Sequence, residues 1–245
     1  NTPGDTVVVE PVPTRDHSER MLAGFGARIV VGASRQGRVI TLSGEAELAP
    51  QTIIVPGDPS SAAFPMVAAL IVPGSDVTIT NVGINPTRAG LMEVLKAMGG
   101  DITLENSRIV GGEPVADLRV RYSMLTGIDV PADIAPRMID EFPILFIAAA
   151  LARGTTRTSG LDELRVKESD RLAVMAQGLT AIGVKVEERL DGLVIHGRDG
   201  EPFAGNAQIA SHLDHRIAMS FAIAGLHARA PISVDDRAPI ATSFP

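Results

Sequence analysis

Residues 169–188, SDRLAVMAQGLTAIGVKVEE, carry the pattern that decides the fold. Arg171 stands near the start, apolar residues follow at helical spacing, and Gly183 precedes a short strand-like run. This spacing predicts an amphipathic helix followed by a strand. The same pattern occurs earlier in TRDHSERMLAGFGARIVV (14–31) and TRAGLMEVLKAMGGDITL (87–104), so an arginine-led helix recurs about every 75–85 residues.

A second kind of helix alternates with the first. It begins near an aspartate, at position 58, 140 or 214, and runs through mostly apolar residues to a turn and a strand. The stretch FPILFIAAALA (142–152) is apolar on every face, which predicts a wholly buried helix. Hairpin-like pairs such as ARIVVG and RVITLSG lie between the helices. The sequence therefore predicts an α/β fold of repeated β-α-β-α-β-β units, with buried helices inside and sheets around them.

The aspartates at the starts of the buried helices have an ordinary explanation. An aspartate N-cap accepts backbone N–H bonds, and we expect Asp58 and Asp214 to be caps. Taken alone, Asp140 is also better explained as a cap than as a catalytic group, although the two roles do not exclude each other. Asp170 is expected to cap its helix or to pair with a nearby arginine. If the copies pack symmetrically, the helix N-termini meet at one face, where their partial positive charge favours anions.

The composition narrows the class of protein. The 245 residues are 45% hydrophobic and 21% charged, with a net charge of −7. This acidic balance argues against a nucleic-acid or membrane-surface binder, and no apolar run is long enough to span a membrane. The absence of cysteine excludes a disulfide framework and a thiolate metal site, and it fits a cytoplasmic location. Because the chain opens at Asn1 directly before a strand-like run, we expect it to be part of a longer protein.

Charged residues gather just before the helices, at the same end of each repeat. RVKESDR (165–171) combines cations with carboxylates, and MIDEFP (138–143), LDHRIAMS (213–220) and PTRDH (13–17) add more. Arginine can bind phosphate or carboxylate through paired N–H donors, and a carboxyl group can transfer a proton. The sequence therefore predicts a site for an anionic substrate that undergoes proton transfer. The candidate residues are Arg15, Asp140, Lys167, Glu168, Arg171, His215 and Arg216.

These motifs, in this order, resemble the 5-enolpyruvylshikimate-3-phosphate (EPSP) synthase family, in its class II type noted for tolerance to glyphosate. The matching stretches cover nearly the whole chain. They are RVKESDR and DHRIAMSF, which together are highly specific, and PTRDHSE, VPGDPSSAAFP, PGSDVTITNVG, NPTR, MIDEFPIL and IATSFP. The resemblance implies the enolpyruvyl transferase fold, an inside-out α/β barrel of two lobes. It also implies that residues 1–53 are the last unit of one lobe, and that residues 54–245 are most of the other, two full repeats plus part of a third.

The family's reaction joins phosphoenolpyruvate to the 5-hydroxyl of shikimate 3-phosphate and releases phosphate, as a step of the shikimate pathway toward aromatic amino acids. The resemblance implies a transferase without a cofactor or a metal. Carried over by motif, Asp140 binds the attacking hydroxyl and helps to deprotonate it. Lys167 contacts both substrates and shuttles a proton, and Glu168 protonates the enol methylene and later removes that proton.

The other motif residues are implied as substrate ligands. Arg171 and Arg216 hold phosphoenolpyruvate with His215 beside them, and Arg15 holds shikimate 3-phosphate from the opposite lobe. Both substrates are polyanions, so several cations are needed to hold them together. The family's front part, with further substrate ligands, lies outside this chain. We therefore expect the chain alone to be inactive and the full-length enzyme to be a monomer, with glyphosate as a candidate inhibitor.

Two alternatives stay open. An enolpyruvyl transferase acting on UDP-N-acetylglucosamine shares the fold and the donor, although RVKESDR favours shikimate 3-phosphate. A non-catalytic repeat domain that binds a ligand or a partner chain is the other, although charged residues at every helix mouth argue against a purely structural role. We expect Arg88, at the repeat position of Arg15 and Arg171, to be structural. We expect no metal at the remaining histidines, which are His17, His196, His212 and His227.

Overall fold

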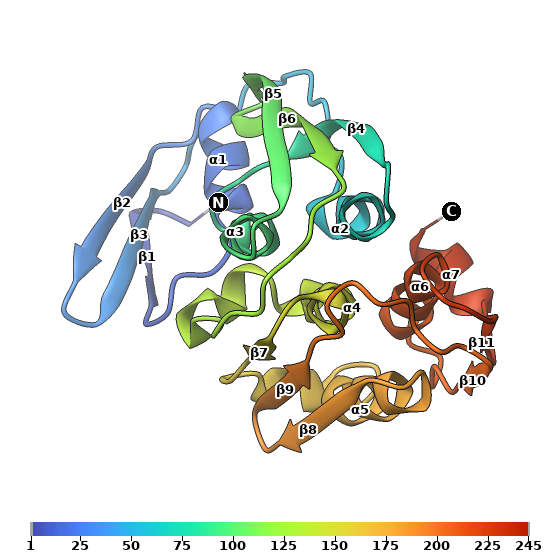
Figure 1. The fold of residues 1–245 in the computed structure, drawn as a ribbon. Helices are drawn as coiled ribbons and strands as arrows, with labels where there is room; N and C mark the ends of the chain where they lie inside the picture. The colour runs from blue at the N-terminus through green and yellow to red at the C-terminus, as the bar shows by residue number, and fades with distance from the viewer. Residues whose placement is uncertain (1, 245) are drawn as a thin grey trace.

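One small sheet recurs three times along the chain in the computed structural model, which describes residues 2–244 (Figure 1). In each copy a strand is followed by a helix and then by a hairpin, whose second strand is the middle strand of an antiparallel sheet. The arginine-led repeat is therefore confirmed. The copies are β1 (Asp5–Glu10), α1 (His17–Gly24), β2 (Ile29–Ser34) and β3 (Gly37–Ser43); β4 (Asp76–Gly83), α3 (Gly90–Ala97), β5 (Asp101–Val110) and β6 (Glu113–Arg121); and β7 (Thr155–Arg157), α5 (Arg171–Ala181), β8 (Lys185–Arg189) and β9 (Gly192–His196).

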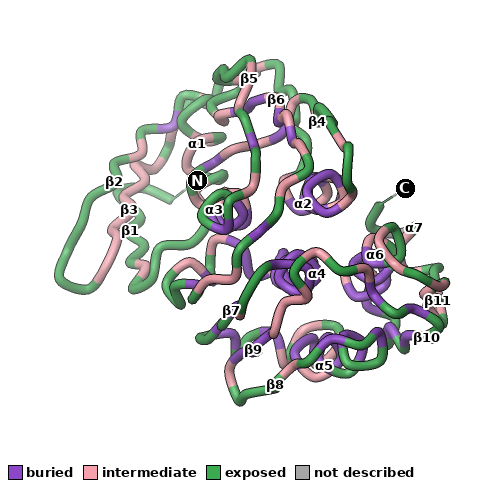
Figure 2. The backbone as a smooth tube through the Cα atoms, viewed as in Figure 1, coloured by how far each residue is buried: buried purple, intermediate pink, exposed green. Residues whose placement is uncertain are grey.

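The apolar helices α2 (Pro59–Ile71), α4 (Phe142–Leu151) and α6 (His215–Gly225) pack against one another. Every residue of α4 is buried, as its apolar sequence requires, because no face of the helix could be exposed to water without loss of stability. The buried residues concentrate on these helices and on the sides of the sheets that face them (Figure 2). The predicted architecture of buried helices within surrounding sheets is confirmed.

The strand predicted to open each unit forms only in part. In two units it is reduced to isolated parallel bridges, one in the first unit and two in the second, whereas in the third it makes a short parallel pair and one further bridge. The bridges are Gly57–Val82 in the first unit, Thr126–Arg153 and Asp129–Arg157 in the second and Phe203–Ala228 in the third, where the pair is β10 (Ala207–Ile209) with β11 (Ile232–Val234).

Aspartate caps begin two of the buried helices, as expected. The carboxylate of Asp58 accepts bonds from the N–H groups of Ser60 at 3.1 Å and Ser61 at 3.0 Å. Asp214 accepts one from the N–H of Arg216 at 3.0 Å. These bonds satisfy backbone donors that a helix start leaves unpaired.

The start of α4 differs from this pattern. Short 3₁₀ turns precede it, η1 (Ala132–Arg137) and η2 (Ile139–Glu141), and its N-cap residue is Glu141, which makes no side-chain cap bond within the described chain. The expectation that Asp140 is a cap is therefore wrong. Because of the turn η2, Asp140 lies one residue before the cap position. The Asp140 side chain contacts cationic side chains and not the N–H groups of α4.

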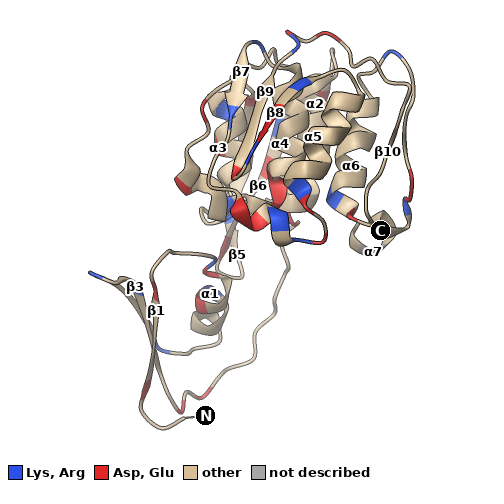
Figure 3. Ribbon diagram, turned by 90° about the horizontal axis from the view of Figure 1, so that it is seen from below, with Lys and Arg blue, Asp and Glu red and all other residues tan. Residues whose placement is uncertain are grey.

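The helices α4, α5 and α6 run side by side with their N-terminal ends at one edge, where charged residues gather (Figure 3). The turn η3 (Asp162–Val166) leads to α5, and α7 (Ala238–Ser243) follows β11 near the same edge. Asp170 caps α5 through the N–H of Ala173 at 3.0 Å and pairs with Arg165 at 2.9 Å, so both expected contacts are present.

The strands and helix of residues 2–53 face this charged edge and lie apart from the main core (Figure 3). Ala27 is the one buried apolar residue that the structure describes before Ala62. The apolar residues Val7, Val8, Val9, Val30 and Val31 of this sheet are exposed. Across residues 2–244, we find no helix with both the length and the apolar character needed to cross a membrane.

We expect Gly178→Ala to destabilise the protein, although alanine favours helices by about 1 kcal/mol over glycine. A Cβ on Gly178 of α5 would lie 2.2 Å from the ring of Phe221 in α6, and such overpacking typically costs about 1–3 kcal/mol. The matched control is Gly225→Ala, at the end of α6, where a Cβ would have no neighbour within 4 Å. In urea denaturation followed by circular dichroism, the control should be neutral or stabilising. Equal effects of the two substitutions would contradict the packing of α5 on α6.

Candidate active site

The carboxylate of Asp140 lies among four cationic side chains from three segments of the chain. Arg15 approaches within 3.4 Å from the segment before α1, and Arg171 approaches within 3.4 Å from the start of α5. Arg216, at the start of α6, lies 3.7 Å away, and the Lys167 ammonium, just after η3, lies 3.8 Å away. Cations from three separate sequence motifs therefore converge on the carboxylate of a fourth motif in the structure.

This charge environment controls the ionisation of Asp140. Burial by itself would raise the pKa of its carboxyl group, but the charges of Arg216, Lys167 and the other two cations hold the pKa below its usual range. The group is thus a stable anion and a hydrogen-bond acceptor. Its contacts of 3.4–3.8 Å are longer than ordinary charge-assisted hydrogen bonds, so the cations keep donors that could turn to an anionic ligand.

Arg171 is the most deeply buried of the four cations, with its side chain 1% exposed. Its Nε donates to Oδ2 of Asp214 at 2.8 Å, and its Nη2 donates to Oε2 of Glu168 at 2.5 Å. Burial would raise the pKa of Asp214, but the bonds and charge of Arg171, helped by Ser169, lower it overall. The guanidinium therefore ties together the starts of α5 and α6 and the turn before α4.

Lys167 and Glu168 occupy the loop between η3 and α5. The Lys167 ammonium forms an ion pair with Glu163 in addition to its contact with Asp140. The Glu168 side chain is 51% exposed, so its carboxylate remains accessible while one of its oxygens accepts from Arg171. An accessible carboxylate beside a cationic cluster can exchange a proton with a bound ligand.

Arg165 holds this loop in place. Its guanidinium donates to the carbonyl oxygens of Leu190 and Arg189, each at 2.6 Å, in the turn between β8 and β9. It also pairs with Asp170 at 2.9 Å and with Glu188 at 3.0 Å. The position of the Lys167–Glu168 segment is therefore set by the sheet of its own unit.

The start of α6 supplies His215 and Arg216. The Nη1 of Arg216 donates to the main-chain oxygen of Asp140 at 3.2 Å, so this arginine binds the turn as well as the carboxylate. Burial and the neighbouring charge of Arg216 lower the pKa of His215, which keeps its imidazole neutral near pH 7. Both residues line a hollow of about 290 Å³ between the N-terminal ends of α2 and α6, together with Asp58, Ser60, Ser61, Phe64 and Met219.

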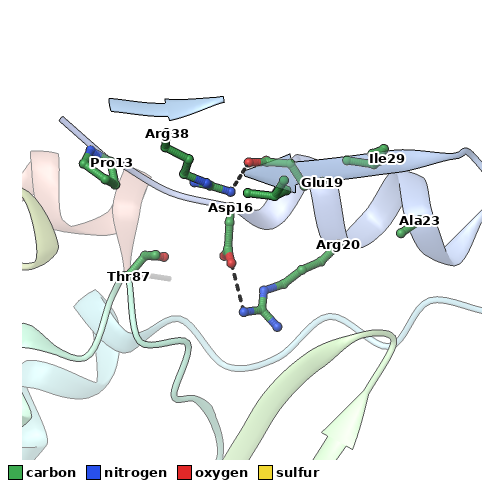
Figure 4. Close-up of a pocket in the computed structure, with 9 residues that line it drawn as sticks. Pro13, Asp16, Glu19, Arg20, Ala23, Ile29, Arg38 and Thr87 are labelled. Atoms are coloured by element: carbon green, nitrogen blue, oxygen red, sulfur yellow. Dashed lines mark hydrogen bonds and ion pairs between the residues drawn. The ribbon is translucent and has the colours of Figure 1, made fainter. Parts of the chain in front are cut away.

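A larger hollow, of about 560 Å³, lies beside α1 and the β2–β3 hairpin (Figure 4). Its charged groups are paired with one another. Arg38 forms ion pairs with Glu19 and, at 3.2 Å, with Glu10, and Arg20 pairs with Asp16 at 2.9 Å. The two arginines face three carboxylates, those of Glu10, Asp16 and Glu19, so this hollow carries an excess of negative charge and has little attraction for an anion. The Asp140 cluster is therefore the stronger candidate despite the smaller space beside it.

Asp16, His17 and Glu113 form the one group in residues 2–244 whose histidine and carboxylate atoms lie close enough to share a cation, within 4.8 Å. The carboxylates are already engaged, since the Asn85 amide donates to Asp16 at 2.6 Å and to Glu113 at 2.9 Å. The His17 Nδ1 lies 2.7 Å from Glu113. These bonds join α1 to β6 and hold the strands and helix of residues 2–53 against the rest of the protein.

Sequence reasoning missed a second polar cluster, on the other side of the Asp140 turn. Glu141 is 3% exposed and accepts a hydrogen bond from the Ser60 hydroxyl, which accepts in turn from Arg88 at 2.6 Å. The one available signal was Arg88, which shares the repeat position of Arg15 and Arg171 and was expected to be structural. Neither Ser60 nor Glu141 stands out in the sequence, because their partners are distant along the chain.

Comparison with known proteins identifies the family. Residues 1–245 match the family described as EPSP synthase (3-phosphoshikimate 1-carboxyvinyltransferase). A protein of Sphingopyxis alaskensis named 3-phosphoshikimate 1-carboxyvinyltransferase is 72% identical over 246 residues, and one of the same name from Zymomonas mobilis is 64% identical over 248 residues. Each match covers 100% of this chain and 55% of the relative, so the chain spans about half the length of the curated relatives it matches.

Solved structures agree with this match. EPSP synthase from Acinetobacter baumannii superposes with a TM-score of 0.92 at 52% identity, over 99% of this chain and 55% of that one. The enolpyruvyl transferase NikO from Streptomyces tendae superposes with a TM-score of 0.75 at 19% identity, over 99% of this chain and 53% of its own, and shares the fold alone. The chain has the enolpyruvyl transferase fold, and by sequence and structure together it belongs to the EPSP synthase family.

Proposed function

We propose that this chain supplies one side of the active site of a transferase that moves the enolpyruvyl group of phosphoenolpyruvate to the 5-hydroxyl of shikimate 3-phosphate. The observation that carries the proposal is the Asp140 carboxylate held among four cations at the N-terminal ends of buried helices. The relatives' name, 3-phosphoshikimate 1-carboxyvinyltransferase, supports the choice of acceptor and of transferred group. Because the chain spans about half of those relatives, the complete reaction is assigned to the whole protein.

The chemistry requires one proton to be accepted from the hydroxyl and another to be added and then removed at carbon. The hydroxyl oxygen attacks C2 of phosphoenolpyruvate while C3 takes up a proton, which gives a tetrahedral intermediate. The bond from C2 to the phosphate oxygen then breaks as C3 loses a proton, so the double bond returns and phosphate leaves. In our proposal Asp140 accepts the hydroxyl hydrogen, and this proton finally leaves with the phosphate, which departs as hydrogen phosphate. Glu168 donates and removes the C3 proton, and Lys167 contacts both substrates and shuttles protons between these groups.

The remaining cations are proposed as ligands of the two polyanions. Arg171 and Arg216, with His215 beside them, hold phosphoenolpyruvate at the starts of α5 and α6, where helix dipoles add to their positive charge. Arg15 holds shikimate 3-phosphate from the side of α1. Two reactants fixed in this way lose little further entropy on reaching the transition state. The smaller entropy loss lowers the free-energy barrier and accounts for a large part of the rate enhancement that such a site can supply.

Other parts of the proposal concern the whole protein. We take residues 1–53 as the last unit of one lobe and residues 54–245 as most of the other, with the substrates between them. We expect a cytoplasmic, monomeric enzyme that needs the remaining part found in its relatives, and glyphosate is a candidate inhibitor. A nucleotide-sugar acceptor is not favoured, because the family match is to enzymes named for 3-phosphoshikimate.

Phosphate release tests the proposal directly. The hybrid protein combines this chain with the segments of the Sphingopyxis alaskensis relative that lie outside the match, and the intact relative is the positive control. We expect the hybrid to release phosphate from shikimate 3-phosphate plus phosphoenolpyruvate, and the 245-residue chain alone to release none. A folded hybrid that shows no release would contradict the proposed function. Turnover by the chain alone would contradict the need for the remaining part.

Asp140→Asn in the hybrid tests the role of the carboxylate. General-base loss typically lowers kcat by about 10²–10⁴-fold. The pKa of Asp140 is held below its usual range, so the parent carboxylate is ionised near neutral pH. An amide has no acidic proton to lose, so raising the pH should not restore the variant. The matched control is Asp129→Asn, which removes an exposed carboxylate that pairs with Arg157, and it should keep the parent rate. Equal rates for the two variants would remove Asp140 from the mechanism.

A further inference from the structure

The turn that carries Asp140 is anchored from its buried side by Glu141. The Glu141 side chain is 3% exposed, and the cation that it contacts is Arg88, at 3.5 Å, which is not one of the four around Asp140. The proposed mechanism does not use it. A buried carboxyl group is costly unless it is bonded, so its partners indicate what it does.

Those partners form a directed chain of hydrogen bonds. The Nη2 of Arg88 donates to the Ser60 hydroxyl at 2.6 Å, which leaves the hydroxyl hydrogen free to donate to Oε1 of Glu141. The same Arg88 nitrogen lies 3.5 Å from Glu141 and 3.6 Å from Asp58, the cap of α2. The chain therefore links the start of α2, the segment before α3 and the start of α4.

This chain and the active-site cluster hold opposite sides of one short turn. On the open side Arg216 donates to the main-chain oxygen of Asp140 at 3.2 Å. On the buried side the Ser60 hydroxyl donates to the carboxylate of Glu141, the residue that follows Asp140. The main-chain N–H of Glu141 donates to the main-chain oxygen of Met138 at 2.9 Å. The direction of the Asp140 side chain follows from the path of this turn. If the buried bonds were removed by substitution, the turn would be free to move. No residue proposed to bind a substrate would have been changed.

We propose that Glu141 is a positioning residue, which acts through Ser60 and Arg88 to fix the Asp140 carboxylate where it meets the substrate hydroxyl. The inference rests on the proposed function, because it concerns the same reaction. A misplacement of about 1 Å in such a group can cost about a hundredfold in rate. The expected defect lies mainly in kcat, because Arg171 keeps its bonds to Asp214 and Glu168 when the turn is loosened.

The experiment uses the hybrid protein and three variants with a control. Glu141→Leu removes the acceptor at similar volume, Ser60→Ala removes the bridging hydroxyl, and Glu141→Gln keeps an acceptor oxygen. The control is Thr158→Val, which removes another buried hydroxyl, bonded to the main chain of Leu193 at 3.0 and 3.2 Å and remote from Asp140 in sequence and contacts. Folding is checked by circular dichroism, and kcat and KM are measured for both substrates.

We expect Glu141→Leu and Ser60→Ala each to lower kcat by about ten- to a hundredfold, with KM for phosphoenolpyruvate changed by less than about threefold. The double variant should be no slower than the slower single variant, because both break one chain of bonds. Glu141→Gln should keep at least about a third of the parent kcat, and Thr158→Val should match the parent.

Parent-like kcat in folded Ser60→Ala would overturn the inference, even if Glu141→Leu fails to fold. Effects of Glu141→Leu and Ser60→Ala that match those of Thr158→Val would overturn it as well, since the role would then be structural only. A hybrid that is inactive before any substitution would overturn the proposed function first, and the inference with it. These results are distinguishable because the unsubstituted hybrid is measured in the same series.

Discussion

The buried guanidinium of Arg171 is the interaction on which the candidate site depends. A charge with 1% of its side chain exposed must be paired, since removing one partner of a buried ion pair typically costs about 3–5 kcal/mol. Its partners are Asp214, Glu168 and Asp140, which come from three segments far apart in the chain. Pairing this one cation therefore brings the starts of α5 and α6 and the turn before α4 to the same edge.

The arginine-led repeat gives this arrangement a simple symmetry. Arg15 and Arg171 both lie against Asp140, and Arg88, at the same repeat position, lies against the adjacent Glu141. Three copies of one sequence feature thus converge on two neighbouring carboxyl groups. The Asp140 side is open and can receive a ligand, whereas the Glu141 side is closed off by α2. This difference in exposure fits the roles that we propose: the accessible Asp140 carboxylate reacts with the substrate, and the buried Glu141 carboxylate supports it.

Much of this organisation could be predicted from the sequence, because it depends on local pattern. The all-apolar run 142–152 can only be a buried helix in a globular protein, and the spacing of Arg15, Arg88 and Arg171 marks equivalent helices. The convergence of the charged motifs followed from their common position in the repeat. The individual roles of Asp140, Lys167 and Glu168 came from resemblance to a family and remain proposals.

The parts that sequence reasoning missed depend on tertiary distances. Whether Asp140 caps α4 is decided by one extra residue in a 3₁₀ turn, which no propensity specifies. The opening strands are reduced to isolated bridges in two units, which the sequence pattern does not indicate. The Ser60–Glu141 bond joins residues 81 positions apart, and nothing in either local sequence indicates the other.

The most direct test of the central claim is a crystal structure of the complemented protein with shikimate 3-phosphate and a non-reactive phosphoenolpyruvate analogue. Our account predicts the 5-hydroxyl within hydrogen-bond reach of Asp140, about 2.6–3.2 Å, and the analogue's anionic groups on Arg171 and Arg216. Substrates bound away from this carboxylate, for example in the hollow lined by Arg20 and Arg38, would contradict it.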